Sequence, residues 1–201
     1  MKKPLIIALL LILSFAYINA DEHLLFSGKC GEYNSVWKNL NEKDYAIKYD
    51  DKDNVFYFRT ADWINNAWIY LTWEDVAKLR KNLEKYFEWE KIAIENKVTI
   101  EKKLPDATIT TKVTWKFGDD WYSARNFVMS FTFFSQTETR HQLVLTTSKA
   151  TGSNQFVTYQ IDGYYFDKNQ VQQLYDALNE EILKKQISEI KKNKDKESLF
   201  N

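Results

Sequence analysis

Between residues 72 and 95 the apolar positions recur with the period of a helix. Five of them follow one another at intervals of three or four residues, with the last two adjacent: Val76, Leu79, Leu83, Tyr86 and Phe87. This spacing places all five on one side of an α-helix. Thr72 followed by Asp75 has the composition of a capping box, which satisfies free amide groups in the first turn. The pattern therefore predicts a long amphipathic helix that begins after Thr72 and covers a sheet.

A second helix of the same kind is predicted after Asp167, with Gln170 as its capping-box partner. Its apolar stripe contains four residues: Val171, Leu174, Leu178 and Ile182. A shift of 95 positions superposes residues 69–83 on residues 164–178, and each stretch is a predicted strand followed by a capped helix. Two interpretations stay open. Either the chain contains two similar half-domains that arose by duplication, or capped helices that follow strands simply look alike.

Much of the remaining chain alternates apolar and polar residues with a period of two. The clearest case is residues 108–117, where Ile109, Val113 and Trp115 fall on one side and threonines and lysines on the other. Alternation of this kind is typical of half-buried strands in an antiparallel sheet. Because the connections between the later strands are short, we expect a meander. The other predicted strands are residues 45–49, 55–58, 67–71, 98–103, 127–133, 141–145 and 156–166.

These elements predict an α+β domain. Its antiparallel meander sheet carries two long amphipathic helices packed on one face, which makes a two-layer sandwich. The domain is expected to span residues 44–190. Residues 21–43 show no clear period and are expected to be loosely structured. The lysine-rich residues 191–201 are expected to form a charged, flexible tail.

Residues 1–20 have the composition of a secretory signal peptide. Two lysines precede an apolar run that ends at Ile18, and Ala20 comes just before an acidic stretch. The run is short for a membrane span, which needs roughly 20 apolar residues, so an uncleaved anchor is the less favoured alternative. The prediction is export to the periplasm or the extracellular space, with no membrane span left after cleavage. The lysine-rich, cysteine-poor composition favours a bacterial source.

The net charge limits which partners are expected, and the cysteine content limits how the fold can be stabilised. The 201 residues include 28 basic and 28 acidic side chains, so the formal net charge is +0. A protein that binds nucleic acid would need a basic excess or a basic stripe, and no such partner is expected. Cys30 is the single cysteine, so no disulfide can form within the chain and stability has to come from packing.

Several kinds of active site lack the residues that they require. Two histidines and one cysteine cannot build a closed zinc site within one chain. The five glycines never have the spacing of a phosphate loop, and no Gly-x-Ser-x-Gly elbow occurs. His141 alternates with Leu143 and Leu145, which favours a sheet histidine over a catalytic base. Asp119 and Asp120 fall in a predicted turn, where aspartate is favoured for backbone reasons.

Signal cleavage after Ala20 would create a candidate metal site at the new N-terminus. The mature chain would begin with Asp21, Glu22 and His23. An α-amine, two deprotonated amides and an imidazole in third position can surround Cu(II) or Ni(II) in square-planar geometry. The alternative is that a histidine occupies the third position by chance. No other cofactor is indicated.

The aromatic residues offer a second route to function. Four of them are predicted at strand ends and turns: Trp63, Trp68, Trp121 and Tyr122. Exposed rings at such places stack on sugars or anchor a partner protein, whereas the alternative for each ring is core packing. Trp121 and Tyr122 directly follow a predicted hairpin turn, which makes them the best candidates for exposure.

Two functions are consistent with these patterns. The favoured one is an exported, non-catalytic binding protein of the bacterial envelope or extracellular space, whose partner is a protein or an envelope component. The alternative is a small secreted hydrolase or small-ligand-binding protein, whose site would use scattered Asp, Glu and Tyr side chains. A deep pocket lined by acids with raised pKa values would favour this alternative.

Overall fold

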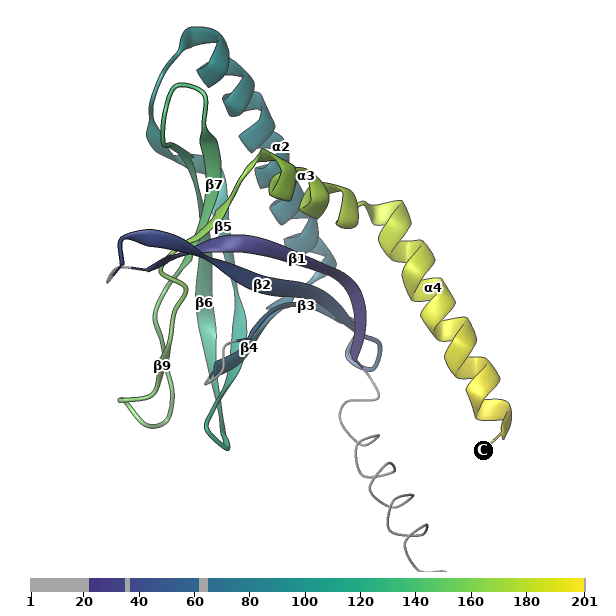
Figure 1. Ribbon diagram of the computed structural model, residues 1–201. Helices are drawn as coiled ribbons and strands as arrows, with labels where there is room; N and C mark the ends of the chain where they lie inside the picture. The colour runs from purple at the N-terminus through teal and green to yellow at the C-terminus, as the bar shows by residue number, and fades with distance from the viewer. Residues whose placement is uncertain (1–21, 35–36, 62–64, 201) are drawn as a thin grey trace, which may run out of the picture.

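The computed structural model describes residues 22–34, 37–61 and 65–200. The chain folds as an α+β protein, in which three helices pack against an antiparallel meander sheet of eight strands (Figure 1). This confirms the predicted fold class at that level. The predicted signal peptide lies outside the described residues. No helix in the described ranges is both long enough and apolar enough to cross a membrane.

The sheet closes on itself, which differs from the predicted open two-layer sandwich. Its strands are β1 (Glu22–Asn34), β2 (Asn39–Asp50), β3 (Val55–Ala61), β4 (Asn65–Leu71), β5 (Glu101–Phe117), β6 (Asp120–Ser135), β7 (His141–Thr147) and β10 (Tyr164–Phe166). Each strand pairs with the next along the chain, and the last strand returns to the first through Gly31↔Tyr165 and Glu32↔Tyr164. Strands β8 (Ala150–Thr151) and β9 (Thr158–Tyr159) form a separate two-stranded sheet.

Strand β1 corrects the prediction that residues 21–43 are loosely structured. It pairs with β2 from Glu22↔Asp50 to Asn34↔Asn39, with a bulge after Leu24. Its side chains are mostly half-buried on both faces, so it lacks the apolar–polar alternation by which strands are recognised. Pairing with β2 and β10, rather than a hydrophobic pattern of its own, holds β1 in the sheet.

Strand β5 runs straight through a site where a turn was predicted. Residues 98–103 and 108–117 were expected to be two strands separated at Pro105. Instead the pairing between β5 and β6 shifts register between Lys103 and Thr108, where Asp106 has a φ of 52°. The extra residues bulge out of the ladder, and the strand continues beyond them.

Helix α2 (Trp73–Asn96) begins as the sequence predicts. The Asp75 amide donates to Oγ1 of Thr72 at 3.2 Å, and the Thr72 amide donates to Oδ2 of Asp75 at 3.0 Å. The helix ends at Lys97, whose backbone adopts the left-handed conformation. Of the five predicted stripe residues, Phe87 is partly buried against the core. The other four are buried: Val76, Leu79, Leu83 and Tyr86.

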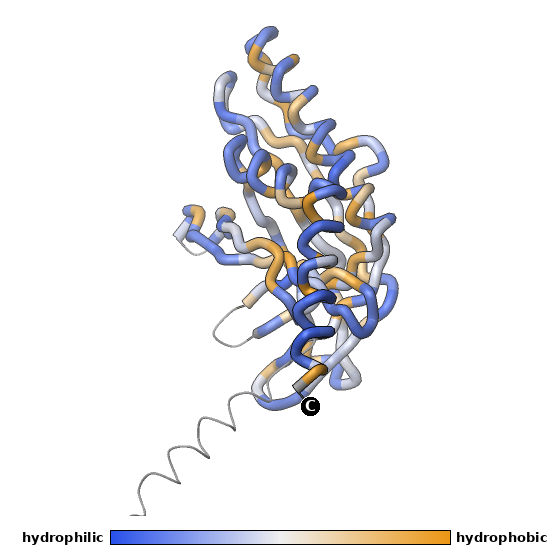
Figure 2. The backbone as a smooth tube through the Cα atoms, turned by 90° about the vertical axis from the view of Figure 1, so that its right-hand side faces the viewer, coloured by the Kyte–Doolittle hydropathy of each residue, from blue (hydrophilic) through white to orange (hydrophobic). Residues whose placement is uncertain are grey.

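The predicted second long helix is in fact two helices, α3 (Lys168–Ala177) and α4 (Glu180–Glu197), followed by the short turn η1 (Ser198–Phe200). Asn179 restarts the helix, because its Oδ1 accepts hydrogen bonds from the amides of Glu181 and Ile182. The break turns Ile182, a predicted stripe residue, out to solvent. Figure 2 shows that α4 is hydrophilic along most of its length. Residues 191–197, which were predicted to be a flexible tail, belong to this helix.

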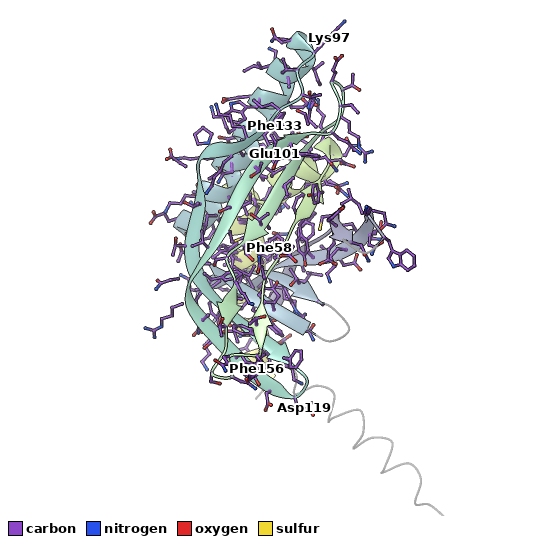
Figure 3. All side chains as sticks on the ribbon, turned by 90° about the vertical axis from the view of Figure 1, so that its left-hand side faces the viewer. Phe58, Lys97, Glu101, Asp119, Phe133 and Phe156 are labelled. Carbon is purple, nitrogen blue, oxygen red and sulfur yellow. The ribbon has the colours of Figure 1, made fainter. Side chains whose placement is uncertain are left out.

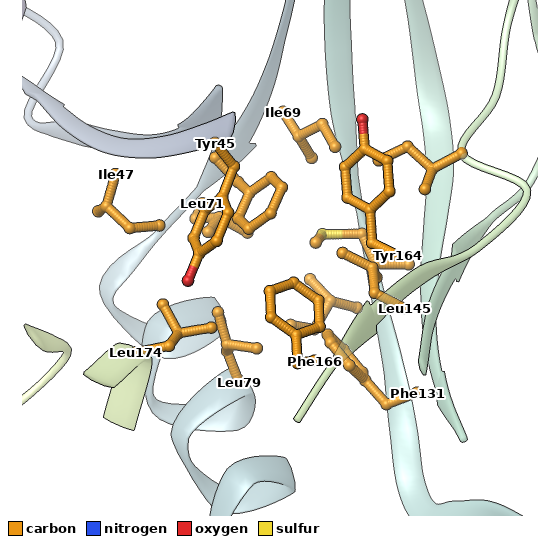
Figure 4. Packing of buried hydrophobic residues seen from close by; sticks show 14 of the residues in the cluster. Tyr45, Ile47, Ile69, Leu71, Leu79, Phe131, Leu145, Tyr164, Phe166 and Leu174 are labelled. Carbon is orange, nitrogen blue, oxygen red and sulfur yellow. The ribbon is translucent and has the colours of Figure 1, made fainter. Parts of the chain in front are cut away.

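The core lies between the helices and the inner face of the sheet. Figure 4 shows Leu79 and Leu174, from α2 and α3, facing Tyr45, Phe166 and other strand residues across a continuous apolar interior. Burial of each such side chain stabilises the fold by roughly 1.5–3 kcal/mol. The helices therefore supply one side of the core and the inner face of the sheet supplies the other.

The order of elements repeats along the chain. Strands β1 to β4 are followed by α2, and β5, β6, β7 and β10 are followed by α3. Residues 148–163, with β8 and β9, are an insertion in the second half. Arg80 and Tyr175 are 95 positions apart, as in the sequence shift, and they touch: Nη1 of Arg80 donates to the carbonyl oxygen of Tyr175 at 2.9 Å. The repeated order and this contact are what the duplication interpretation predicts, and that interpretation stays a prediction.

The central place of α2 leads to a stability prediction. Leu83→Ala should reduce the free energy of unfolding by about 3 kcal/mol, because it leaves a cavity where α2 meets the sheet. Ile92→Ala, on the same helix but 54% exposed, is the matched control and should cost less than about 1 kcal/mol. Urea denaturation followed by circular dichroism measures both values. Equal losses would contradict the assignment of α2 to the core.

Candidate functional site

The outer face of strands β3 to β6 presents aromatic and basic side chains. Arg59 pairs with Trp68 between β3 and β4, and Lys116 pairs with Trp121 between β5 and β6. Directly paired residues of antiparallel strands share a face, and alternate residues face opposite sides. Because Ile69 lies in the core, its neighbour Trp68 projects from the outer face. The closed sheet thus brings these side chains together from separate strands.

Trp68 and Trp121 form an aromatic pair with Arg59 beside it. The ring centroids of Trp68 and Trp121 are 4.9 Å apart at 45°, and the guanidinium carbon of Arg59 lies 4.9 Å from the Trp68 ring. Trp68 is only 7% exposed, whereas Trp121 is 57% exposed. We call Arg59, Trp68 and Trp121 the Trp68–Trp121 surface. Trp121 adjoins Asp119, which Figure 3 places at the opposite end of the molecule from Lys97.

The polar atoms of this surface are not all satisfied. Nε of Arg59 and Nε1 of Trp68 are buried, and neither has a hydrogen-bond partner within the described part of the chain. Arg59 also makes no ion pair with any described residue. A guanidinium stacked on an aromatic ring keeps its charge and its capacity for paired hydrogen bonds to a carboxylate. The surface therefore offers an apolar ring and an unpaired cation side by side.

The aromatic and basic character continues along the same face. Tyr57 and Tyr70 form an edge-to-face pair at 4.8 Å, and Nζ of Lys112 lies 4.5 Å from the Tyr70 ring. The Tyr57 hydroxyl donates to Oδ2 of Asp50 at 3.0 Å. Burial, together with the neighbouring Tyr70 and Asp50, raises the pKa of Tyr57 well above its usual range. The Tyr57 phenol therefore stays protonated, and its hydrogen is engaged by Asp50.

Tyr122 and Trp63 were the other two predicted aromatic contact residues, and the described part of the structure does not place either of them on this surface. Tyr122 faces the inside of the sheet, where its ring stacks on Trp115 at 5.7 Å and 24°. Trp63 lies outside the described residues. Sequence reasoning missed Arg59, because only the strand register places it opposite Trp68. No local pattern marks it.

Two of the predicted N-terminal metal residues, Glu22 and His23, lie in β1 and are paired with β2. His23 lies in β1 opposite Tyr49, and its Nε2 is 3.6 Å from Oδ1 of Asp51. Asp21 lies outside the described residues. Binding of a metal through the main-chain amides would require this end of β1 to leave β2, so the Cu(II) or Ni(II) site stays a prediction. Across the described ranges, no group of three or more His, Cys, Asp or Glu residues could hold a metal ion.

The two residue types most suited to catalysis, His141 and Cys30, are buried and hydrogen-bonded within the fold. The ring of His141 is buried, with Nδ1 2.8 Å from the Ser135 hydroxyl and Nε2 3.2 Å from the carbonyl oxygen of Glu138. This agrees with its predicted role as a sheet histidine. Burial raises the pKa of the Cys30 thiol to about 12, and the thiol donates to the carbonyl oxygen of Lys43. A thiol in this state is a poor nucleophile.

The ion pair between Lys194 and Asp51, which lies beside His23 at the start of β1, leads to a pH prediction. Burial by itself would raise the pKa of Asp51, but the hydrogen bond and charge of Lys194, 2.5 Å away, and the nearby His23 more than offset it. The net result is a pKa below its ordinary value. A carboxyl of this kind stabilises the fold above its unfolded pKa, and the stabilisation is lost as the pH falls through the folded pKa.

Asp51→Asn should therefore lower the free energy of unfolding by about 1 kcal/mol at pH 7. The difference from the unsubstituted protein should shrink as the pH falls through the folded pKa of Asp51, which lies below its ordinary value, because the carboxyl becomes neutral there. Asp53→Asn, an exposed neighbour in the same turn, is the matched control. Urea denaturation at several pH values measures the effect. A difference independent of pH would show that Asp51 acts through packing and not through its charge.

Comparison with protein-family models, with curated proteins and with solved structures finds no match for this chain. No family is therefore assigned. The function has to be argued from the surfaces that the fold presents and from the chemistry of their side chains.

Proposed function

We propose that this protein is an exported, non-catalytic binding protein of the bacterial envelope or extracellular space. Its partner is a protein or an envelope component, held on the Trp68–Trp121 surface. Export is supported by the composition of residues 1–20, in which two lysines precede an apolar run and a small residue. The binding role is supported by the geometry of the outer face of the sheet.

The observation that carries the proposal is the exposed indole of Trp121, which packs at a tilt against Trp68 beside Arg59. Tryptophan, tyrosine and arginine are the residues that dominate the energy of protein interfaces. Trp121 offers a large apolar area, and its contact with Trp68 holds the ring in place before a partner arrives. Less side-chain freedom is then lost on binding, which favours affinity.

The charges of the same face indicate the chemistry of the partner. Arg59 and Lys112 both lie beside aromatic rings, and neither has an ion-pair partner among the described residues. A partner with carboxylates around an apolar centre would match them. The non-catalytic assignment is supported by the buried thiol of Cys30 and by the satisfied ring of His141.

Export makes a direct prediction about the mature chain. Protein recovered from the periplasm or the medium should begin at Asp21, because the signal peptide is removed after Ala20. Intact-mass spectrometry of the exported protein measures this. Full-length protein that begins at Met1 and sediments with membranes would support the uncleaved anchor and contradict the proposal.

The binding surface is tested by substitution. Trp121→Ala and Arg59→Gln should each weaken capture of the partner from envelope extract by roughly tenfold or more, as for residues at the centre of an interface. Trp37→Ala is the matched control, because Trp37 is 75% exposed on the β1–β2 hairpin and makes no ring contact with any described residue. Quantitative pull-down with immobilised protein gives the affinities. Unchanged capture by Trp121→Ala, or an equal loss with Trp37→Ala, would contradict the proposal.

A further inference from the structure

A groove separate from the Trp68–Trp121 surface lies between two hairpins. Its walls come from the hairpin of β1 and β2 and from the ends of β6 and β7, with β10 between them, and its volume is about 350 Å³. Figure 1 shows the β1–β2 hairpin projecting away from the upright β6 and β7. Sites for small ligands typically measure about 300–1,000 Å³, so this groove is large enough for one sugar-sized molecule.

Gln142 is the most buried residue that lines the groove. It is 4% exposed, yet its amide makes no hydrogen bond to any described residue. The amide nitrogen and oxygen are not among the buried polar atoms that lack a partner, so the amide end of this side chain reaches the solvent of the groove. The neighbouring Gln136 also lines the groove and has no side-chain partner in the described ranges. Two amides, each with a donor and an acceptor, are thus available to a ligand.

The lining of the groove is positively charged. Arg140 and Lys38 both contribute to it, and no carboxylate is among the described residues that do. Neither cation has an ion-pair partner in the described part of the chain. The guanidinium of Arg140 is planar and forms paired hydrogen bonds to a carboxylate, which fixes the orientation of the bound group. The charge therefore selects an anionic ligand.

Aromatic side chains complete the groove. Phe134 and Tyr165 meet edge to face at 6.0 Å and 82°, and Tyr33 lines the groove from the β1–β2 hairpin. Burial, followed by the charges of Glu101 and Tyr33, raises the pKa of Tyr165. Its hydroxyl therefore stays protonated at neutral pH and can donate a hydrogen bond. Rings of this kind offer an apolar surface with a polar edge, as ligands with both characters require.

We propose that this groove binds an acidic monosaccharide, a hexose-sized ring that carries a carboxylate. Such a ligand matches each part of the lining. Arg140 pairs with the carboxylate, the amides of Gln136 and Gln142 bond to neighbouring hydroxyl groups, and the aromatic rings cover the apolar side of the sugar. The site is separate from the Trp68–Trp121 surface: β6 contributes to both, but through Phe134 near its end here and through Trp121 near its start there.

Isothermal titration calorimetry of the purified protein with glucuronate and galacturonate tests the proposal. At least one of them should bind roughly tenfold or more tightly than glucose, because glucose lacks the group that Arg140 holds. Arg140→Gln should remove this preference, and Arg140→Lys should restore only part of it, since lysine lacks the planar fork. Gln142→Leu should weaken binding of the acidic sugar further. Arg125→Gln, at an exposed arginine outside the groove, is the matched control.

Three results would overturn the proposal. The first is that neither acidic sugar binds more tightly than glucose. The second is that Arg125→Gln weakens binding as much as Arg140→Gln does. The third is that acetate binds as tightly as the acidic sugars, which would reduce the groove to a general anion site. Circular dichroism of each variant shows whether it is folded. If Arg140→Gln does not fold, the two single variants Arg140→Lys and Gln142→Leu replace it, and each should weaken binding of the acidic sugar.

Discussion

Burial of the α2 stripe against the inner face of the sheet is the interaction on which the rest of the structure depends. Leu79, Leu83 and Tyr86 reach the strands of both halves, and the Tyr86 hydroxyl donates to the carbonyl oxygen of His141 at 2.9 Å. Because no disulfide can form within the chain, this packing acts together with the strand pairing to hold the eight strands in place. The helices are therefore tied to the core side of the sheet. The side chains available for recognition lie on its outer face and on its hairpins.

The distinction between the core side and the outer face of the sheet explains why neighbouring aromatic residues differ in exposure. Trp115 and Trp121 both lie in the β5–β6 hairpin, but Trp115 projects inward and is fully buried, whereas Trp121 projects outward. A shift of one position changes the face of a strand residue. Tyr122, next to Trp121, consequently stacks in the interior. The face that a residue occupies, more than its place beside a turn, decides whether its ring is available to a partner.

Local patterns made the helix starts and most of the strands predictable, because capping and periodicity are short-range effects. Thr72 and Asp75 identify the beginning of α2 without any knowledge of the fold. The closure of the sheet could not be predicted in this way, since it rests on the pairing of Gly31 with Tyr165 from opposite ends of the chain. The break at Asn179 was also missed, because an apolar stripe continues across it. The candidate site shares this limit: Trp68 and Trp121 were foreseen as separate residues, but their contact, and the place of Arg59, depend on register.

The central claim is that the Trp68–Trp121 surface is covered by a partner when the protein does its work. Hydroxyl-radical footprinting in the presence and absence of envelope extract, followed by mass spectrometry, measures the exposure of individual indoles. The account predicts that oxidation of Trp121 falls in the presence of extract while that of Trp37 is unchanged. Equal oxidation of Trp121 with and without extract would contradict it.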